Sequence, residues 1–410
     1  MVKNRYLTAK EAASALDISL PTLYAYVSRG LIRSEASTEG QRVKRYYAED
    51  IEKLIARKEG RRNPEKLARD ALHWGSPILE SAITLIAEGK FYYRGLEVSE
   101  LALNYLAEDI ATLIWSGSFD KSEQLFNPES FISAQKYETM LVHIAVDGID
   151  LSPIASLEVM LAVAAMDDVS AYDLRPQTVM QTGARILRLM TSVMAGDVPE
   201  NISLAEMLAR GWCPDKAYGA ELLNIALILC ADHELNASSF TARVVASTGS
   251  TPYGVVQAGL AALQGVKHGG HTERVEALWD EIGSPERAGV TLSGRLRRGD
   301  QIPGFGHILY TEDPRAKFLL NYLFERFPEH PVLEMAEAIM KGAEQTIGEY
   351  PSIDFALVTL SKVLALPEHS AMALFALGRT IGWIGQAIEQ YQTNRLIRPR
   401  ARYIGEQPKS

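Results

Sequence analysis

Seven short polar segments interrupt the apolar stretches in the second half of the chain, and they carry residue types that acid–base chemistry needs. Histidines, aspartates and arginines stand there beside glycines or at the ends of apolar stretches. This layout is typical of an active site whose side chains come from several loops on a rigid scaffold. The segments are residues 231–236, 265–271, 303–310, 313–316, 352–355, 378–380 and 397–400.

Taken alone, several of these segments have a simple structural interpretation. Residues 232–234 follow an apolar stretch, so a solvated helix end is the simpler interpretation there. His268 and His271 flank two glycines, and incidental histidines at a helix break explain them as well as a metal pair does, since no cysteine or carboxylate stands nearby at ligand spacing. Asp354 stands near a predicted helix start, where the helix dipole favours an aspartate.

The combination of segments predicts more than any one of them. His307 follows a Gly-x-Gly loop, and Arg379 lies inside an apolar stretch, where a guanidinium needs an anionic partner from the protein or a ligand. Lys267 is predicted to keep His268 neutral, because a neighbouring like charge disfavours protonation. Neutral histidines, one carboxylate and several arginines suit carbon–carbon bond formation. The carboxylate deprotonates a weak carbon acid, a histidine donates to its carbonyl, and arginines hold a substrate with more than one carboxylate.

The elements that position these segments are predicted to be almost entirely helical. Three short strands are expected at residues 83–86, 90–93 and 96–98, with a turn at Glu88 and Gly89. From about residue 100 the apolar period is helical, and no strand alternation of any length follows. The predicted fold class is therefore mainly α. One helical stripe is expected to contain Leu103, Leu106, Ile110, Leu113 and Ile114.

Residues 1–62 are predicted to form a separate winged helix-turn-helix. Thr8 and Glu11 have the spacing of a capping box, and Ser19 and Pro21 mark the start of a second short helix. A basic hairpin follows as the wing, with Arg42, Lys44 and Arg45 available for phosphates. Residues 1–70 carry a net charge of +5, with 15 Lys+Arg and 10 Asp+Glu, against −9 for the whole chain. This asymmetry indicates two tasks or two partners.

This N-terminal segment resembles the DNA-binding domain of the MerR family over about 55 residues. The matching residues are 6–13, 22–26, 30–32 and 45–46. The resemblance implies that Thr22 and Tyr24 face the major groove of DNA. The alternative is a winged helix-turn-helix that has become a protein-contact or dimer element.

From about residue 76 to the C-terminus the chain resembles the citrate synthase family. The matching residues, in family order, are 93–95, 231–243, 268–270, 303–307, 313–316, 354–355, 378–383 and 398–400. The resemblance implies a helical homodimer, with a large domain of residues 76–214 and 331–410, a small domain of residues 215–330, and a linker of residues 63–75 before them.

The resemblance also implies a role for each polar segment. Asp354 takes a methyl proton from acetyl-CoA or propionyl-CoA, His268 donates to the thioester carbonyl, and His307 polarises the ketone of oxaloacetate. These acyl-CoA molecules are co-substrates, so no permanently bound cofactor and no metal are expected. The implied oxoacid ligands are His233, Arg315, Arg379 and, from a second copy, Arg398, and the implied CoA contacts are Gly304, Gly306 and Ile308.

The chain departs from the family pattern beside its predicted catalytic residues. Lys267, His271 and Thr272 stand where the family usually has an apolar residue, alanine and asparagine, and Ile308 where bacterial members often have arginine. Citrate formation is the leading expectation. 2-Methylcitrate formation is the nearest alternative, because no residue visibly reads out one extra methylene. An acyl-CoA-sensing DNA-binding regulator without turnover is the alternative of another class.

Bulk composition narrows the class of protein. The 47% apolar and 23% charged residues are those of an ordinary globular chain, long enough for two or three domains. No stretch approaches the roughly 20 apolar residues of a membrane span, and the first residues lack the apolar run of a secretory signal. Two cysteines give no disulfide framework. A cytoplasmic location without membrane contact is expected.

Overall fold

The computed structural model describes most of the chain and divides it into two compact units, Met1–Glu80 and Ser81–Ser410. Each unit is considered separately. The residues described are 6–16, 18–29, 31–36, 44–48, 50–51, 54, 79–120, 122–126, 152–196, 202–406 and 408.

The N-terminal unit has the predicted helix-turn-helix with a small sheet. Helices α1 (Ala9–Leu16) and α2 (Leu20–Ser28) are followed by strands β2 (Ser34–Ala36) and β3 (Lys44–Tyr47), and β3 lies between β2 and β1 (Tyr6–Leu7) in an antiparallel sheet. The capping box forms, since the Thr8 N–H donates to the Glu11 carboxylate at 2.8 Å and the Glu11 N–H donates to the Thr8 hydroxyl at 3.3 Å. The buried residues of this unit form their own apolar core, made of Ala12, Ala13, Leu16, Leu23, Ile32, Tyr46 and Ile51.

Some predictions for the N-terminal region fall on residues that the structure does not describe. Arg42, the turn of the wing and the linker at residues 63–75 are among them. Of the other predicted DNA contacts, Tyr24 is 52% exposed and Lys44 is exposed, whereas Thr22 and Arg45 are half-buried. The Thr22 hydroxyl lies 2.8 Å from that of Ser19, which caps α2.

The second unit opens with the predicted three-stranded sheet. Strands β4 (Thr84–Ala87), β5 (Lys90–Tyr93) and β6 (Leu96–Glu97) are antiparallel in the order β4-β5-β6. Beyond them the described residues contain only helices and two isolated bridges. The helices are α5 (Val98–Asn104), α6 (Ala107–Ser116), α7 (Ser122–Leu125), α9 (Pro153–Asp167), η2 (Val169–Tyr172), α10 (Pro176–Ala195), α11 (Leu204–Trp212), α12 (Gly219–Cys230), α13 (Ala237–Ala246), α14 (Pro252–Leu263), α15 (His271–Ile282), η3 (Pro285–Arg287), α16 (Ala288–Arg298), α17 (Pro314–Arg326), α18 (Pro331–Ile347), α19 (Ile353–Leu364) and α20 (Ser370–Thr393).

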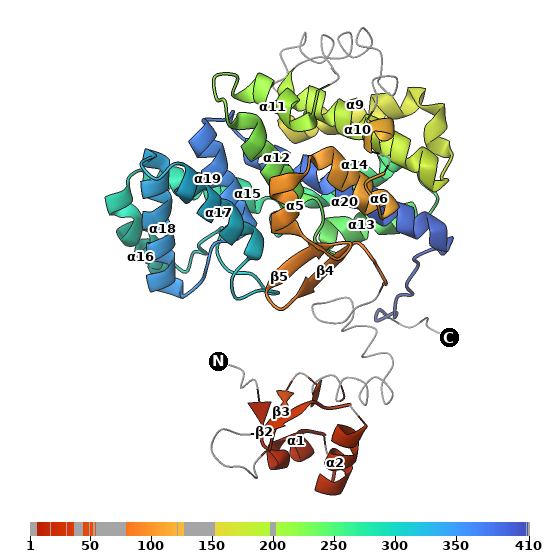
Figure 1. Cartoon of the computed structure of the whole chain (residues 1–410), viewed down its shortest axis with the longest axis vertical. Coiled ribbons are helices and arrows are strands. Elements are labelled where there is room, and N and C mark those ends of the chain that lie inside the picture. The colour runs from red at the N-terminus through yellow and green to blue at the C-terminus, as the bar shows by residue number, and fades with distance from the viewer. Residues whose placement is uncertain are drawn as a thin grey trace. The chain divides into compact units, whose positions relative to one another are not determined.

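Helix α20 is the central element of this unit (Figure 1). It packs against α6, α10, α12, α13 and α14, and helices α15 to α19 gather on one side of it. Gly259 of α14 permits a close approach, because a Cβ there would lie 2.5 Å from the ring of Trp383. Helix α20 is also long and apolar enough to cross a bilayer, but its apolar window is entirely buried inside the unit, as in the core helix of a globular protein. The predicted division of this unit into a large and a small domain stays a prediction.

The predicted stripe at residues 103–114 is only partly correct. The chain leaves helical geometry at Tyr105, between α5 and α6, so Leu103 and Leu106 are 53% and 47% exposed. Ile110, Leu113 and Ile114 are buried as expected. The period continued across a helix boundary that no glycine or proline marks, and so the stripe was predicted too long.

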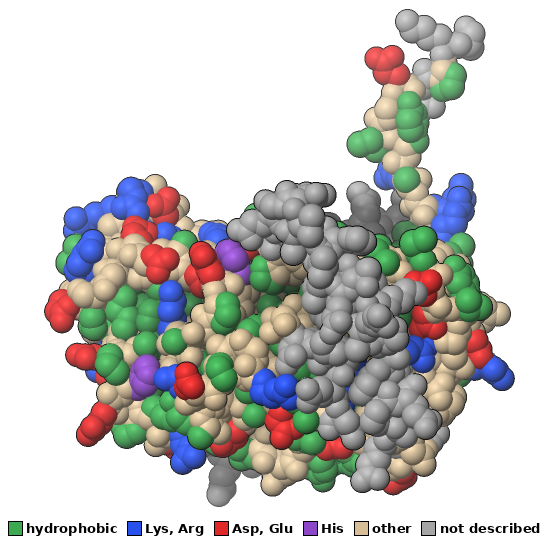
Figure 2. All heavy atoms as spheres, turned by 90° about the horizontal axis from the view of Figure 1, so that it is seen from above, with side chains coloured by type: hydrophobic (Ala, Val, Ile, Leu, Met, Phe, Trp, Pro, Cys, Tyr) green, Lys and Arg blue, Asp and Glu red, His purple; other side chains and the backbone are tan. Residues whose placement is uncertain are grey.

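The surface of the molecule carries both signs of charge. On the face shown in Figure 2, basic and acidic side chains lie side by side at many places over the described elements, with apolar side chains between them. Ion pairs such as Lys341–Glu337 at 2.7 Å contribute to this mixture. A surface with interspersed charges of both signs favours colloidal stability. It does not indicate a binding partner of one charge.

Candidate active site

The turn after α12 is buried at Asp232 and His233, so the interpretation as a solvated helix end is wrong for these two residues, whereas Glu234 is exposed. Asp232 is fully buried, and His233 is 6% exposed. The Thr84 hydroxyl donates to the Asp232 carboxylate at 2.6 Å, and the Asp232 N–H donates to the Tyr93 hydroxyl at 3.0 Å. Burial raises the pKa of Asp232 to about 6. Sheet β4–β5 therefore holds this turn in the interior, where Asp232 Oδ2 has a partner and Oδ1 has none among the described residues.

His233 and His307 lie together in what we call the oxoacid cluster, whose members are His233, His307, Tyr310, Arg315 and Arg379. The two imidazole rings are 5.3 Å apart, and His233 Nε2 lies 2.8 Å from the Tyr310 hydroxyl. Burial lowers the pKa of His233 well below its ordinary value, with Arg315 and Arg379 adding to the effect. His233 is therefore neutral near pH 7.

The glycine loop that carries His307 is fixed to the start of α19. The Gly306 N–H donates to the Tyr350 carbonyl at 2.9 Å, and the Ser352 N–H donates to the Gly304 carbonyl at 2.8 Å. Gly304 has φ +85°, and Gly306 has φ +79°. Residues with side chains rarely adopt this left-handed region, and a Cβ at Gly304 would also lie 2.7 Å from Val275. The loop thus requires glycine for both conformation and space.

The hydrogen bonding of His307 assigns its proton. The Leu309 N–H donates to His307 Nδ1 at 3.1 Å. Burial lowers the pKa of His307 to about 4, with a further contribution from Arg315. A neutral imidazole that accepts at Nδ1 carries its single proton on Nε2. His307 can therefore donate a hydrogen bond from Nε2 to a substrate oxygen.

Asp313 connects Arg315 to the start of α19. It accepts from Arg315 Nε at 3.0 Å and from Nη2 at 2.7 Å, and its Oδ2 also accepts from the Ile353 N–H at 3.2 Å. Burial alone would raise the pKa of Asp313, but Arg315 outweighs burial and the pKa is lowered. The ion pair is almost completely buried, so its geometry is fixed before any ligand arrives.

Arg379 is buried without a complete set of partners. Its Nε donates to the Cys230 carbonyl at 2.9 Å, and its guanidinium carbon lies 4.7 Å above the ring of Phe375. Nη1 and Nη2 have no hydrogen-bond partner among the described residues. A buried guanidinium with two unused nitrogens is costly unless a ligand supplies acceptors.

His268 and Asp354 form, with His271, a second group that we call the helix-start cluster. His268 Nε2 lies 2.7 Å from the Ser238 hydroxyl. Burial lowers the pKa of His268 to about 4, and Arg379 and His271 add to this. The predicted neutrality thus has a cause other than Lys267, which is exposed.

Asp354 lies in the first turn of α19, as predicted. The Ser352 hydroxyl donates to its Oδ2 at 3.2 Å. Burial raises the pKa of this half-buried carboxyl. A carboxylate whose pKa is raised is a stronger base once ionised, which suits proton abstraction.

Two predicted residues lie apart from these contacts. Ile308 is 70% exposed, and Arg398 is exposed in the segment that follows α20. Sequence reasoning missed the roles of Ser238 and Tyr310, although both stand inside segments that it had already singled out. The pattern of a single sequence does not show which histidine will form a hydrogen bond with a given hydroxyl.

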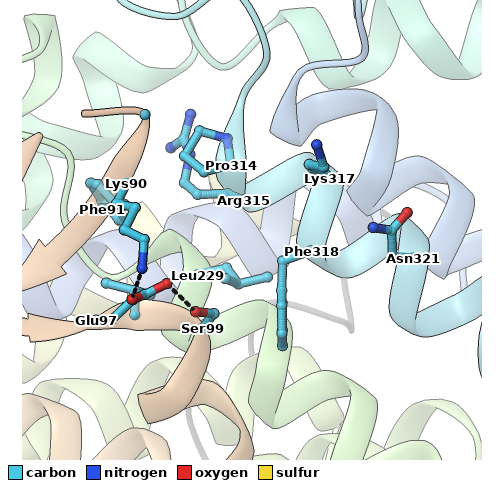
Figure 3. A pocket seen from close by; sticks show the side chains of 12 residues that line it. Lys90, Phe91, Glu97, Ser99, Leu229, Pro314, Arg315, Lys317, Phe318 and Asn321 are labelled. Atoms are coloured by element: carbon cyan, nitrogen blue, oxygen red, sulfur yellow. Dashed lines mark hydrogen bonds and ion pairs between the residues drawn. The ribbon is translucent and has the colours of Figure 1, made fainter. Parts of the chain in front are cut away.

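A cavity of about 240 Å³ adjoins the oxoacid cluster (Figure 3). It lies between β5, the start of α5, α12 and α17, and Arg315 is part of its lining. Phe91 also lines it and packs 5.6 Å from the ring of His233. At its edge Lys90 is paired with Glu97 at 2.7 Å, as the dashed line in Figure 3 shows. Among the described residues no group of three His, Cys, Asp or Glu is placed to hold a metal ion.

Comparison with known proteins decides the family of this second unit. The family model "Citrate synthase, C-terminal domain" matches residues 71–400, and "Helix-turn-helix domain" matches residues 6–59. The chain belongs to the citrate synthase family. Members of this family are acyltransferases, and this chain is one of them.

Individual relatives support the assignment over most of the chain. The citrate synthase of Haloferax volcanii is 30% identical over 359 residues, which cover 81% of this chain and 94% of the relative. The 2-methylcitrate synthase 2 of Corynebacterium glutamicum is 27% identical over 346 residues, covering 77% and 88%. The solved citrate synthase of Thermoplasma acidophilum, in ternary complex with carboxymethyl coenzyme A and oxaloacetate, has a TM-score of 0.68 at 26% identity, covering 82% of this chain and 96% of that one. This citrate synthase fold therefore carries both clusters described above.

Proposed function

We propose that the chain condenses acetyl-CoA with oxaloacetate to give citrate and CoA. The observation that carries the proposal is Arg379, whose two unpartnered guanidinium nitrogens lie in a buried cluster with the neutral His233 and His307. Such a cluster suits a small dianion with a ketone. Arginine binds a carboxylate through two parallel hydrogen bonds, and a neutral histidine donates to a carbonyl without competing for the charge.

The oxoacid cluster binds and polarises the first substrate in this proposal. Arg315, Arg379 and His233 hold the carboxylates of oxaloacetate, and Arg398 of a second copy completes the set in a homodimer. His307 donates from Nε2 to the ketone oxygen and so increases the positive character of the carbon under attack.

The helix-start cluster generates the nucleophile. Asp354 removes a methyl proton from acetyl-CoA while His268 stabilises the resulting enol by donating to the thioester oxygen. When the Ser238 hydroxyl donates a hydrogen bond to His268 Nε2, the neutral ring carries its proton on Nδ1. His268 then donates from Nδ1. The nucleophilic carbon then bonds to the ketone carbon, and the His307 hydrogen bond stabilises the alkoxide that forms until it takes a proton from solvent, to which Asp354 also releases the methyl proton. Water hydrolyses the citryl thioester to citrate and CoA. The loop of Gly304, Gly306 and the exposed Ile308 is proposed to contact CoA.

The acyl group is the open choice, and the relatives named above include both citrate and 2-methylcitrate synthases. Formation of 2-methylcitrate from propionyl-CoA is therefore the second candidate. One methylene in an apolar pocket is worth only about 1–3 kcal/mol, so the two acyl-CoA molecules differ by about 10- to 200-fold at most.

Release of CoA thiol tests the proposal directly. The full chain is assayed with acetyl-CoA or propionyl-CoA against a panel of 2-oxoacids. We expect the highest kcat/KM with acetyl-CoA and oxaloacetate. Asp354→Asn is expected to lower kcat by about 10²–10⁴-fold, the usual contribution of a general base, while oxaloacetate still binds. Native protein that releases no thiol with any pair refutes the enzymatic proposal.

We propose that the N-terminal unit binds DNA. The support is the helix-turn-helix fold, the exposed Tyr24 on α2 and the exposed Lys44 on β3. Thr22 is the neighbouring candidate on α2, and Arg42 and Arg45 are the other wing candidates. A gel shift at low salt with the full chain is expected to retard DNA, and replacing Arg42, Lys44 and Arg45 by alanine is expected to weaken binding and its salt dependence. No retardation by native protein contradicts DNA binding and favours a protein-contact role.

A further inference from the structure

Helices α15 and α19 run side by side in the same direction. Near their starts, the side chains of Val275 and Phe355 meet on either side of Gly304, where a Cβ would lie 2.7 Å and 3.2 Å from them. Further along, Lys362 pairs with Asp280 at 3.4 Å. From the first contact to the second, the residue number increases along α15 and also along α19, so the two helices are parallel. The first turns of the two helices therefore lie at the same end of the pair, on the side of the helix-start cluster.

His271 lies one and two turns before the α15 residues that pack toward the start of α19. His271, Val275 and Trp279 are four residues apart and so share one face of the helix. Val275 lies against Gly304, and the Trp279 ring packs 6.0 Å from that of Phe355. His271 is one turn before Val275, and Asp354 is one residue before Phe355. This register brings the half-buried imidazole toward the carboxylate.

The turn before α15 couples His271 to His268. The His271 N–H donates to the His268 carbonyl at 3.2 Å, so one turn of chain carries both rings. The two residues on either side of this turn, Thr272 and Lys267, have other surroundings. The Thr272 hydroxyl donates to the Gly269 carbonyl at 3.0 Å, and the Lys267 side chain is exposed.

Several charged groups near Asp354 change its pKa, and His271 is one of them. Burial raises the pKa of Asp354, and among the nearby charged groups His271 lowers that pKa most, ahead of Arg315. The Ser352 hydroxyl also lowers it, and Asp313 raises it. The pKa of His268 is in turn lowered by Arg379 and by His271.

We propose that His271 is a positioning residue that acts through Asp354, where its imidazole N–H stabilises the ionised, proton-accepting carboxylate. An imidazole has at least one N–H in either protonation state, so it favours a facing carboxylate in both. The inference rests on the proposed function, because it assigns a task to Asp354 as base. It adds a residue that sets the pH range in which that base works.

The pH profile of kcat is the first test. His271→Ala removes the donor, the pKa of Asp354 rises further, and the base is ionised only at higher pH. We expect the acid limb of kcat to move up by about 1 pH unit, the lower end of the effect of a facing charged partner. Turnover at the foot of that limb then falls about tenfold, and the KM for oxaloacetate changes less than twofold. His271→Gln retains an N–H donor and is expected to recover part of the shift.

Lys267→Ala is the matched control, because it removes a charge four residues away on an exposed side chain. Its acid limb is expected to coincide with that of the native enzyme. An unmoved acid limb in His271→Ala, or an equal movement in Lys267→Ala, overturns the inference.

A double-mutant cycle tests the coupling between His271 and Asp354 without turnover. The unfolding equilibrium is measured for the native chain, His271→Ala, Asp354→Asn and the double variant at pH 7. We expect the two effects to be non-additive by about 3- to 10-fold in the unfolding constant, as for residues that are energetically coupled. Additive effects overturn the inference. Non-additive effects in a protein that releases no thiol support the coupling of His271 to Asp354 and refute only the proposed function.

Discussion

The two clusters of the candidate site differ in how deeply they hold their charges. In the oxoacid cluster Arg315 is 4% exposed, Arg379 is 1% exposed, and His233 is buried against the half-buried His307. In the helix-start cluster His268, His271 and Asp354 are half-buried, and all three stand at or just before the first turn of a helix. The arginines and His233 of the first cluster are part of the packed interior, whereas His307 and the whole second cluster are at its edge.

This difference matches two kinds of chemical work. A group that recognises a charged substrate gains from low dielectric and fixed geometry, because its hydrogen bonds are then strong and already oriented. A group that exchanges a proton in every turnover must return that proton to solvent, and its pKa must be adjustable by neighbours. Replacing residues of one cluster should therefore change substrate binding, and replacing residues of the other should change turnover.

Arg379 provides the strongest test of this separation. Arg379→Met keeps side-chain length but removes the guanidinium, so the oxoacid loses a bidentate partner in a buried site. We expect the KM for oxaloacetate to rise about 30-fold or more, since loss of a buried charged partner costs about 2–5 kcal/mol. The KM for acetyl-CoA should change little. Initial-rate kinetics at varied concentrations of each substrate provide the measurement.

Arg379→Lys is the charge-preserving control for that variant. It is expected to recover part of the affinity but not all, because an ammonium cannot make the same planar pair of bonds. If kcat falls and both KM values stay constant, Arg379 belongs to turnover and the separation between the clusters is wrong.

Asp232 precedes His233 of the oxoacid cluster. The pH dependence of protein stability caused by Asp232 therefore tests how dry the interior beside that cluster is. Burial raises its folded pKa to about 6 from an ordinary value of 3.8. The folded protein therefore holds a proton that the unfolded chain releases between these values. The stabilisation by that proton is complete below pH 3.8 and is lost as pH rises to about 6. The change is on the order of 3 kcal/mol.

Asp232→Asn removes this titration. Urea unfolding of the native chain and the variant from pH 4 to 7 should show their difference in stability moving in favour of the variant as pH rises. A constant difference over this range would mean that Asp232 ionises as it does in water, and the interior would then be wetter than the structure indicates.

A pair of single-hydroxyl deletions gives the smallest expected effect and the sharpest comparison. Tyr310→Phe removes the neighbour of His233, and Ser238→Ala removes that of His268. We expect each to cost about fivefold, since a hydrogen bond is worth about 1 kcal/mol net. Tyr310→Phe should raise the KM for oxaloacetate, whereas Ser238→Ala should lower kcat because His268 loses the partner that sets its proton. Equal effects on both parameters would show that the two clusters act as one.

The sequence predicted helix type and the general position of the site better than the contacts within it. The β4–β6 turns and the Thr8–Glu11 capping box are local signals, and both formed as predicted. The break at Tyr105 and the burial of Asp232 depend on distant partners, such as Asn224, which accepts the Ala107 N–H at 2.9 Å, and Thr84. Neither partner could be chosen from the spacing of residues along the chain.

The histidines show the same limit. Their positions were predicted from glycine-flanked segments, but the neutrality of His268 was assigned to Lys267, the nearest cation in sequence. In the folded chain Lys267 is exposed, and burial together with Arg379, more than a hundred residues away, lowers the pKa instead. Electrostatics follow distances in space, which a single sequence does not give.

The carboxylate of Asp313, which accepts both from Arg315 and from the first amide of α19, has a consequence for how this site can diverge. A substitution there disturbs the oxoacid side and the base-bearing helix at once, so it offers no gradual route to a new substrate. Substitution is expected to be easier at residues outside that ion pair, such as the exposed Ile308. New acyl specificities in this lineage should therefore arise at the edge of the site while its central ion pair stays unchanged.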